Sequence, residues 1–245
     1  KTITVTITDV NDQTPVYQAA DGDDAISVAE NTGVDTSIDD GTITDTDTTN
    51  SFTCTLGGAD ALDFDCAISS NTVSIEFKAV PNYESAADAD TNNVYIVTVL
   101  INDGAANDAN GATTLTITVT DADEFDVGSA SDADDDANSL AENSAADTAA
   151  QVTALATDAD GTTNTVTYGM QSQTCASVFA VHATTGVVTV SDNSNLNAEA
   201  ATSCNVVIRA TSTDGSTSDT TFAITTSDVD EFNMGATSDS NGATN

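Results

Sequence analysis

The chain has 245 residues, of which 40 are Asp or Glu and only three are Lys or Arg, so its formal net charge is −37 at pH 7. This charge excludes nucleic acid and an anionic membrane surface as natural partners, because both would repel it, and it makes a cation the natural partner. No apolar run is long enough for direct membrane insertion. Most acidic residues are Asp, which favours turns over helices, while Thr, Val and Ile fill the segments between, so the composition predicts an all-β chain.

The chain begins with an alternating segment, residues 1–8, in which Thr occupies every second position. A strict period of two predicts a half-buried strand. A lone strand cannot pair its own backbone, so we expect it to be the last strand of a truncated preceding repeat, or a strand that pairs with another chain. Similar patterns predict further strands in the first half of the chain, at residues 26–31, 52–56, 73–77, 94–101 and 114–120.

An acidic motif follows an alternating strand at three places, residues 9–13, 121–125 and 228–232. The copies recur at intervals of about 110 residues, which is typical of a tandem array with one small domain per period. A repeat of this length can bury its own core. We therefore expect four segments: the last strand and linker of a truncated repeat at 1–12, complete repeats at 13–124 and 125–231, and the start of a truncated following repeat at 232–245.

Four cysteines fall two to each complete repeat, Cys54 with Cys66 and Cys175 with Cys204. One disulfide in each repeat is the simplest interpretation, and it would place the protein outside the cytosol. Free buried thiols are the alternative. The only histidine, His182, lies in a predicted hairpin, and neither a zinc-binding spacing nor a phosphate-binding loop occurs, so we expect the chain not to be an enzyme.

Acidic turns repeat in the same order in both complete repeats. Each repeat contains an Asp-x-Asp sequence, at Asp45 and Asp47 and again at Asp158 and Asp160. Alternate residues of an extended segment project to the same side, so each pair brings two short carboxylates together, which would repel one another if nothing neutralised them. The motifs contain no basic residue, and calcium prefers carboxylate and carbonyl oxygens in a tolerant geometry. The pattern therefore predicts calcium sites.

Several motifs in register carry a resemblance to a known family. They are Ala-Glu-Asn at 29–31 and 141–143, the two Asp-x-Asp pairs, Asn-x-Glu at 82–84 and 197–199, Asp-Gly at 103–104 and 214–215, the hairpin at 179–188, and the acidic motif at 121–125. In this order and spacing they resemble the motifs of cadherin repeats, and the resemblance covers nearly the whole chain. It implies an all-β fold of tandem seven-stranded Greek-key β-sandwiches joined end to end, with Ca²⁺ bound between successive domains.

The resemblance also implies which residues would hold Ca²⁺. At the central junction they would be Glu30, Asn82 and Glu84 upstream, Asp123 and Glu124 with the carbonyls of Ala122 and Phe125 in the linker, and Asp158, Asp160 and Asp214 downstream. A partial site at 9–13 would use Asn11, Asp12, Asp45, Asp47 and Asp103. A second partial site at 228–232 would use Glu142, Asn197, Glu199, Asp230 and Glu231. We expect two to three ions at the central junction.

Two departures from the family pattern qualify this expectation. Asn82 and Asn197 stand where the family has Asp, which removes a charge from the outermost ion of each junction, and Glu124 and Glu231 replace a shorter Asp. The two inner ions are therefore expected more firmly than the outermost. The chain also has no Trp, so the Trp exchange of vertebrate homophilic adhesion has no counterpart. These features indicate an acidic, non-vertebrate type of the family.

We interpret the chain as a calcium-binding segment of an extracellular or cell-surface array, adhesive or structural, whose linkers are stiffened by Ca²⁺. Its expected partners are calcium and other repeats of the same parent protein or like molecules. The alternative is a subunit of a self-assembling filament or surface layer that uses residues 1–8 for pairing between molecules. A carbohydrate-binding module is a weaker interpretation, because there is no Trp and there are only four Tyr to form a stacking face for a sugar.

Overall fold

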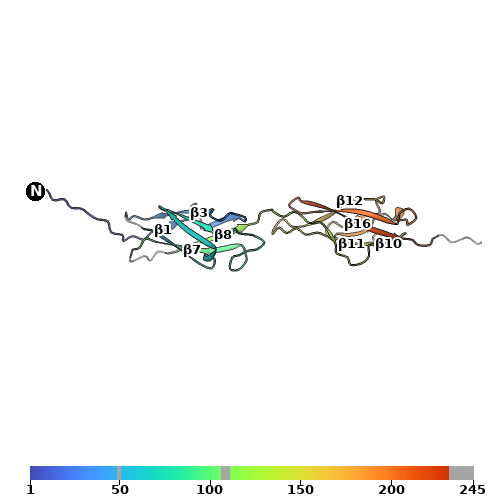
Figure 1. Ribbon diagram of the computed structural model, residues 1–245, viewed down its shortest axis with the longest axis horizontal. Coiled ribbons are helices and arrows are strands. Elements are labelled where there is room, and N and C mark those ends of the chain that lie inside the picture. Colours follow the sequence, from blue (N-terminus) through green and yellow to red (C-terminus); the bar gives the residue numbers. More distant parts are fainter. Residues whose placement is uncertain (49–50, 106–110, 232–245) are drawn as a thin grey trace, which may run out of the picture. The chain divides into compact units, whose positions relative to one another are not determined.

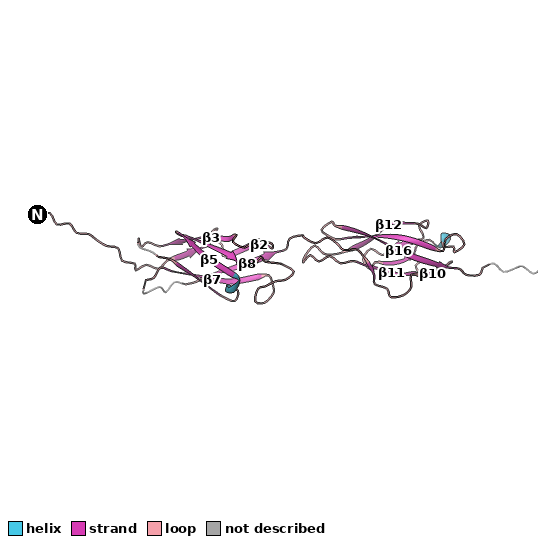
Figure 2. Ribbon diagram, in the orientation of Figure 1, coloured by secondary structure: helices cyan, strands magenta, loops and turns pink. Residues whose placement is uncertain are grey.

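A computed structural model describes residues 1–48, 51–105 and 111–231 of the chain (Figure 1). The chain divides into two compact units, Lys1–Asp123 (unit 1) and Glu124–Asn245 (unit 2), and each is described by itself. The boundary between them lies within the acidic motif at 121–125. Strands and loops make up nearly all of the described residues, with two short 3₁₀ helices, as the colouring in Figure 2 shows.

Unit 1 is a sandwich of two four-stranded sheets, in the orders β1-β3-β6-β5 and β2-β8-β7-β4. All pairs are antiparallel except β2 with β8, which run parallel. In chain order these are the first and last strands of the second sheet. The elements are β1 (Val16–Gln18), β2 (Ala25–Ala29), β3 (Ser37–Thr44), β4 (Thr53–Gly57), η1 (Ala61–Asp63), β5 (Phe64–Ser69), β6 (Thr72–Phe77), β7 (Val94–Asn102) and β8 (Thr113–Thr120).

Unit 2 repeats this topology, with sheet orders β13-β14-β11-β9 and β10-β16-β15-β12. Here β10 and β16 form the parallel pair. The elements are β9 (Ser131–Asp132), β10 (Ser139–Ala141), β11 (Ala149–Leu155), β12 (Thr167–Gln173), β13 (Phe179–Val181), β14 (Val187–Val190), η2 (Asn193–Asn195), β15 (Ser203–Thr211) and β16 (Thr217–Ser227).

The Greek-key sandwich expected from the sequence is confirmed. In unit 1, β1 and β2 are two parts of one edge strand that crosses from the first sheet to the second near Gly22, whose φ of 75° suits a residue without Cβ. The seven expected strands therefore appear as eight segments. Unit 2 divides its edge strand in the same way, into β9 and β10.

Alternation places one face of each strand in the core. On β7 the side chains of Tyr95, Val97, Val99 and Ile101 are each at most 2% exposed. The Tyr95 ring packs edge-on against Phe64 and Phe77, with ring centroids 5.4 Å apart in both pairs. Aromatic burial of this kind compensates for the absence of Trp, because each ring removes a large apolar area from water.

Both expected disulfides form, and the described residues contain no free cysteine. Cys54–Cys66 joins β4 to β5 and so ties together edge strands of the two sheets of unit 1. Cys175–Cys204 joins the loop after β12 to β15, the neighbour of β12 in the same sheet of unit 2. The two bridges therefore occupy different positions in otherwise similar sandwiches.

The expected strand at residues 1–8 does not form. No described strand lies beside this segment to pair with its backbone, and its apolar side chains remain in solvent, with Ile3 83% and Ile7 92% exposed. An alternating pattern predicts a strand only where a partner completes the backbone hydrogen bonds. Residues 232–245, expected to begin a further repeat, lie outside the described residues.

Candidate metal centres

The parallel pairing of β2 with β8 brings two acidic residues together at the end of unit 1. Ala29 is the register partner of Thr120, so the chain leaves both strands side by side and the next residues, Glu30 and Asp121, emerge as neighbours. Glu84 joins them from the loop after β6. Carboxylate oxygens of these three residues, here called the Glu30 cluster, all lie within 4.8 Å of one another.

Glu30 organises the backbone around this cluster. Its side chain is buried, and its two oxygens accept hydrogen bonds from Tyr83 N at 2.7 Å and from Ala122 N at 2.8 Å. One carboxylate therefore fixes both the loop that carries Glu84 and the start of the 121–125 motif. Hydrogen bonds to a charged acceptor are stronger than neutral ones, so the cluster is positioned before any ion binds.

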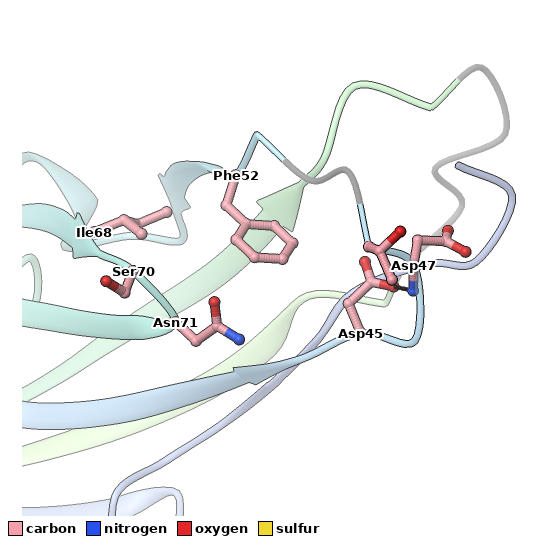
Figure 3. Close-up of a pocket in the computed structure, with 7 residues that line it drawn as sticks. Asp45, Asp47, Phe52, Ile68, Ser70 and Asn71 are labelled. Carbon is pink, nitrogen blue, oxygen red and sulfur yellow. Dashed lines mark hydrogen bonds between the residues drawn. The ribbon is translucent and has the colours of Figure 1, made fainter. Parts of the chain in front are cut away.

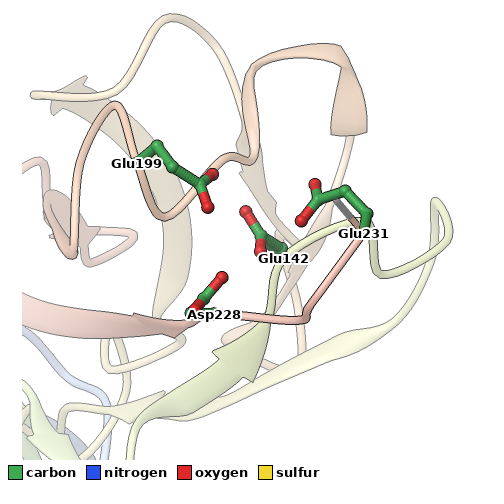
Figure 4. Close-up of side chains that lie close together, drawn as sticks. All are labelled: Glu142, Glu199, Asp228 and Glu231. Carbon is green, nitrogen blue, oxygen red and sulfur yellow. The ribbon is translucent and has the colours of Figure 1, made fainter. Parts of the chain in front are cut away.

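Unit 2 builds the same arrangement from β10 and β16, whose register pairs Ala141 with Ser227. Figure 4 shows the side chains that gather at this end, and their oxygens lie within 4.8 Å of one another. The Glu142 carboxylate accepts hydrogen bonds from Ala198 N and Val229 N, both at 2.7 Å, as Glu30 does in unit 1. This Glu142 cluster consists of Glu142, Glu199, Asp228 and Glu231.

Two pKa shifts show how the Glu142 cluster is balanced. The backbone N–H groups of Val229 and Ala198 lower the pKa of Glu142. A backbone hydrogen bond at Glu199 lowers the pKa of that residue, but desolvation and repulsion from Glu142 and its acidic neighbours outweigh it, and the pKa of Glu199 is raised. The charged form of Glu142 is therefore stabilised, whereas the charged form of Glu199 is destabilised, because several carboxylates converge here without a positive charge between them.

The opposite end of unit 1 gathers Asp45, Asp47 and Asp103, called here the Asp103 cluster, with oxygens within 4.8 Å of one another. Asp103 is only 3% exposed. Asp47 accepts hydrogen bonds at Oδ2 from the backbone N–H groups of residues 12 and 13, at 2.9 and 2.7 Å, so the 9–13 motif folds onto this end of the unit. Figure 3 shows Asp45 and Asp47 at one side of a cavity of about 450 Å³, whose lining includes Phe52.

The Asn11 side chain faces the Asp103 cluster. With the amide assigned from its neighbours, its Nδ2 donates hydrogen bonds to Asp47 Oδ2 at 3.0 Å and to Asp103 Oδ2 at 2.9 Å. The 9–13 motif is therefore held to this cluster by a side chain as well as by its backbone.

The beginning of unit 2 carries a matching group, Asp158, Asp160 and Asp214. Asp160 is 1% exposed, and its Oδ1 accepts hydrogen bonds from Glu124 N at 3.2 Å and Phe125 N at 3.1 Å. Oxygens of Asp160 and Asp214 lie within 4.8 Å of each other. The Oδ2 atoms of both residues are buried without a hydrogen-bond partner, which is unfavourable for a charged oxygen unless a cation is present.

The donor chemistry fits calcium. The residues that form these clusters are all Asp and Glu, and carboxylate oxygens are the ligands of hard divalent cations. Basic side chains are committed elsewhere: Lys78 Nζ lies 3.7 Å from Asp65 Oδ1, and Arg209 forms a two-pronged pair with Asp219 at 2.8 and 2.9 Å. Asp45 Oδ2 in the Asp103 cluster is a further buried oxygen without a hydrogen-bond partner.

Some expected ligands take other positions. Asn82 Oδ1 accepts a hydrogen bond from Ser85 N at 2.6 Å, and Asn197 Oδ1 accepts one from Ala200 N at 2.7 Å, so both amides close turns. The clusters do not include Asp12, Glu124 or Asp230. His182 accepts hydrogen bonds at Nδ1 from two turn N–H groups, which is a structural role.

Sequence reasoning missed Asp121 and Asp228 as cluster members, although each begins a copy of the repeated acidic motif. The signal that identifies them is the position of each residue immediately after a strand that runs parallel to the one preceding Glu30 or Glu142. Periodicity shows that a strand ends there. It does not show which neighbouring strand ends beside it.

Comparison with known proteins gives a consistent answer at the level of fold. No protein-family model and no curated sequence matches the chain. Among solved structures, the chain superimposes on extracellular domains 3–6 of protocadherin gammaB7, determined as a cis-dimer, with a TM-score of 0.66 and 18% identity, covering 90% of this chain and 51% of that one. It spans only 34% and 42% of the protocadherin gammaB4 and gammaB2 structures that it also matches.

Shorter cadherin fragments match as well. Mouse cadherin-23 domains 22–24 align with a TM-score of 0.59 and 24% identity over 91% of this chain and 67% of that one. Human protocadherin-24 domains 1–2 align with a TM-score of 0.62 and 15% identity over 87% of this chain and 98% of that one. These similarities establish the fold. Within the described residues no helix is long and apolar enough to cross a membrane.

Proposed function

We propose that this chain, which folds as tandem cadherin-like domains, is a calcium-binding segment of an extracellular adhesive or structural array. Its linkers would be stiffened by Ca²⁺, and two to three ions would bind at the 121–125 junction. The observation that carries the proposal is the buried Asp160 carboxylate, whose Oδ2 has no hydrogen-bond partner, beside Asp214, whose Oδ2 also has none; carboxylate oxygens of the two residues lie within 4.8 Å of each other. Calcium bound there would provide the missing positive charge.

Each unit supplies one part of the proposed junction. The Glu30 cluster would contribute Glu84 and Asp121 together with Glu30, and unit 2 would contribute Asp158, Asp160 and Asp214. The chain connects the two parts through residues 121–125, whose N–H groups already bond to Glu30 at one end and to Asp160 at the other. Ligands from both sides of a short linker would couple ion binding to the freedom of that linker.

The two partial sites would bind more weakly in this chain. The Asp103 cluster and the Glu142 cluster each draw ligands from a single unit, so an ion there would keep more of its water. Of the two, the Glu142 cluster holds four carboxylates and would bind an ion more firmly. Other repeats of the parent protein, or like molecules, would complete these sites.

Electrostatics explains what calcium would do. Without the ion, the carboxylates within each cluster repel one another, and the chain as a whole carries a formal charge of −37. With the ion, opposite charge and shared ligands restrict the motion of the linker. The acidic residues of the clusters would therefore make the linker flexible when no ion is bound, and the ion would supply the positive charge that favours the stiff state.

Solution scattering of the chain, with calcium and then with a chelator, tests the proposal. We expect the apparent length distribution to broaden and the melting temperature to fall when calcium is removed. Magnesium at the same concentration is the matched control, because it tolerates irregular oxygen sites poorly. An unchanged scattering profile together with an unchanged melting temperature would refute the calcium assignment.

An extracellular or cell-surface location fits two observations on this chain. All four cysteines are paired in disulfides, as expected for a protein that matures in an oxidising compartment. High acidity also keeps a repetitive β-chain soluble. Mass spectrometry of the native protein without reduction tests this point, since a chain with four reduced thiols would contradict it.

A second function, assembly into a filament or surface layer, is favoured by one feature. Residues 1–8 present alternating apolar side chains to solvent, including Val5 at 79% exposure, next to an unpaired backbone. Such a segment can add to the sheet of another molecule. Val5→Pro would remove one backbone donor and prevent this pairing. We expect sedimentation to show larger species that Val5→Pro abolishes if assembly uses this segment, and monomers in both cases if it does not.

A further inference from the structure

Unit 1 contains a small groove that takes no part in the proposed calcium sites. It lies between the loop after β4, which carries Ala59 and Asp60, and the loop that leads from Ala89 into β7. Its volume is about 220 Å³, and Val94 and Ile96 complete its apolar wall. The corresponding connection of unit 2, between β14 and β15, is shorter.

The floor of the groove is a buried negative charge. Asp60 is 3% exposed, and its two oxygens accept hydrogen bonds from Ala89 N at 2.7 Å and Ile96 N at 2.6 Å. These hydrogen bonds give each carboxylate oxygen a donor, but they do not neutralise the negative charge of Asp60. Buried charge with no cation beside it projects its field into the adjoining cavity, where little water screens it.

Further carboxylates add to this field. Asp88 is 2% exposed and accepts hydrogen bonds from Asn92 N and Asn93 N, and Asp90 lies on the rim of the groove. The pKa of Asp90 is raised by its interaction with the Asp88 side chain, by desolvation, and by repulsion from Asp88 and Asp60. The groove therefore combines an apolar wall with an excess of negative charge that its own residues do not neutralise.

From this combination we propose that the groove is a docking site for a lysine side chain of a basic partner protein. The four-carbon stem would lie against Ala59, Ala89 and Ile96, and the ammonium would approach Asp90 at the rim. Charge complementarity selects this occupant, since the carboxylates of Asp60, Asp88 and Asp90 outnumber the one basic group of the adjoining surface, Lys78, whose Nζ donates to Leu62 O at 3.1 Å. Leu62, 85% exposed on the adjoining η1 helix, offers an additional apolar contact.

The groove fits lysine better than arginine or a metal ion. Both oxygens of Asp60 are occupied by backbone donors, and Asp90 Oδ2 already accepts from Asn92 Nδ2 at 2.9 Å, so no carboxylate is free for the two-pronged contact that a guanidinium prefers. A compact ammonium needs no such partner. The close groups of three or more carboxylates in the described chain lie elsewhere, so a bare divalent cation has fewer converging ligands here.

Amide chemical shifts of the intact chain, kept saturated with calcium, provide the test. The probe is Nα-acetyl-lysine methylamide, and the neutral control is Nα-acetyl-norleucine methylamide, which has the same stem without the charge. We expect saturable shifts at residues 59–60 and 89–96 with a dissociation constant on the order of millimolar, and at least tenfold weaker binding of the neutral analogue. Methylammonium, which has the charge without the stem, should also bind at least tenfold more weakly.

Variants separate docking from general attraction. Ala89→Leu fills the groove and should abolish the saturable shifts, and Asp90→Asn should weaken binding at least threefold while leaving the fold intact, because Asp90 is exposed. Asp147→Asn removes an equal charge from an exposed turn of unit 2 and should change nothing. Shifts spread over all acidic turns, equal shifts with methylammonium, or full binding by Asp90→Asn would overturn the proposal.

Discussion

Replacing Asp160 with Asn gives the sharpest test of the calcium proposal, because the expected effect changes sign with the ion. Without calcium, the substitution removes a buried charge whose Oδ2 has no partner and places an amide donor near Asp214. It also weakens the hydrogen bonds from Glu124 N and Phe125 N by about 1 kcal/mol each, because a neutral oxygen accepts less strongly. These effects oppose one another, so we expect unit 2 of the variant to be as stable as the original chain, or more stable.

With calcium, the original chain gains stability and the variant does not. Extracellular calcium modules have dissociation constants of about 0.1 to 1 mM, so calcium at about 10 mM contributes about 1.4 to 2.7 kcal/mol for each site. For a domain of this size that corresponds to a rise in melting temperature of about 5 to 15 °C. Asp160→Asn should lose most of this rise, because it removes a charged ligand.

Hydrogen exchange at the amides of β15, measured in calcium and in chelator, reports on unit 2 within the intact chain. Asp147→Asn is the matched control, since it makes the same change of charge at an exposed residue whose φ of 68° an Asn tolerates. The reasoning fails if Asp160→Asn keeps the calcium-dependent protection, or if Asp147→Asn loses it equally.

Other consequences of the fold and the clusters can be measured independently. Removing the Cys175–Cys204 disulfide, which spans 29 residues, should lower the free energy of unfolding of unit 2 by about 3.5 kcal/mol in a chemical-denaturation series, and an unchanged midpoint would contradict this. Gly186→Ala should destabilise unit 2 by about 1 to 3 kcal/mol more than Gly215→Ala, since both residues have positive φ but only at Gly186 would a Cβ meet a backbone oxygen, at 2.0 Å; equal melting temperatures would refute the clash. In chelator, unit 2 should become more stable as pH falls from 7 toward about 5, because protonation of Glu199, whose pKa is raised, relieves repulsion. It should lose stability below about pH 4, where Glu142, whose pKa is lowered from 4.5, gives up the charge that holds Ala198 N and Val229 N; a monotonic profile would contradict both assignments.

Local sequence pattern was sufficient for much of the fold. Strict alternation identified β8, which buries one face and carries Thr on the other, and a long run of β-branched and aromatic residues identified β7. It did not identify β5, where Asp65 and Cys66 interrupt the apolar pattern and the disulfide to β4 supplies part of the stabilisation. Periodicity also overpredicted residues 1–8, because it carries no information about whether a partner strand is present.

The candidate sites were predictable where ligands follow one another in sequence. Asp45 and Asp47 are two residues apart, and the structure places their oxygens in one cluster, although a bend closed by the hydrogen bond from Asp47 N to Asp45 Oδ1 replaces the extended segment that we expected. Asp121 could not be assigned from sequence, since its proximity to Glu30 depends on the register of β2 against β8. Asn82 is expected as a ligand by its place in the motif, and this stays a prediction; its Oδ1 accepts a hydrogen bond from Ser85 N that the motif did not indicate.

The parallel pairing that builds the clusters also determines how each unit resists mechanical tension. A force that pulls the two ends of a unit apart acts in opposite directions on the two strands of its parallel pair, β2 and β8 or β10 and β16. The hydrogen bonds between these strands are then loaded in shear and share the force, so they do not open one at a time. β2 and β8 share five register pairs, whereas β10 and β16 share three. We therefore expect unit 2 to unfold first under a common load, with its Cys175–Cys204 bridge keeping the enclosed segment from extending. Unit 2 would thus be the mechanically weaker of the two units, and its disulfide would limit how far it can extend.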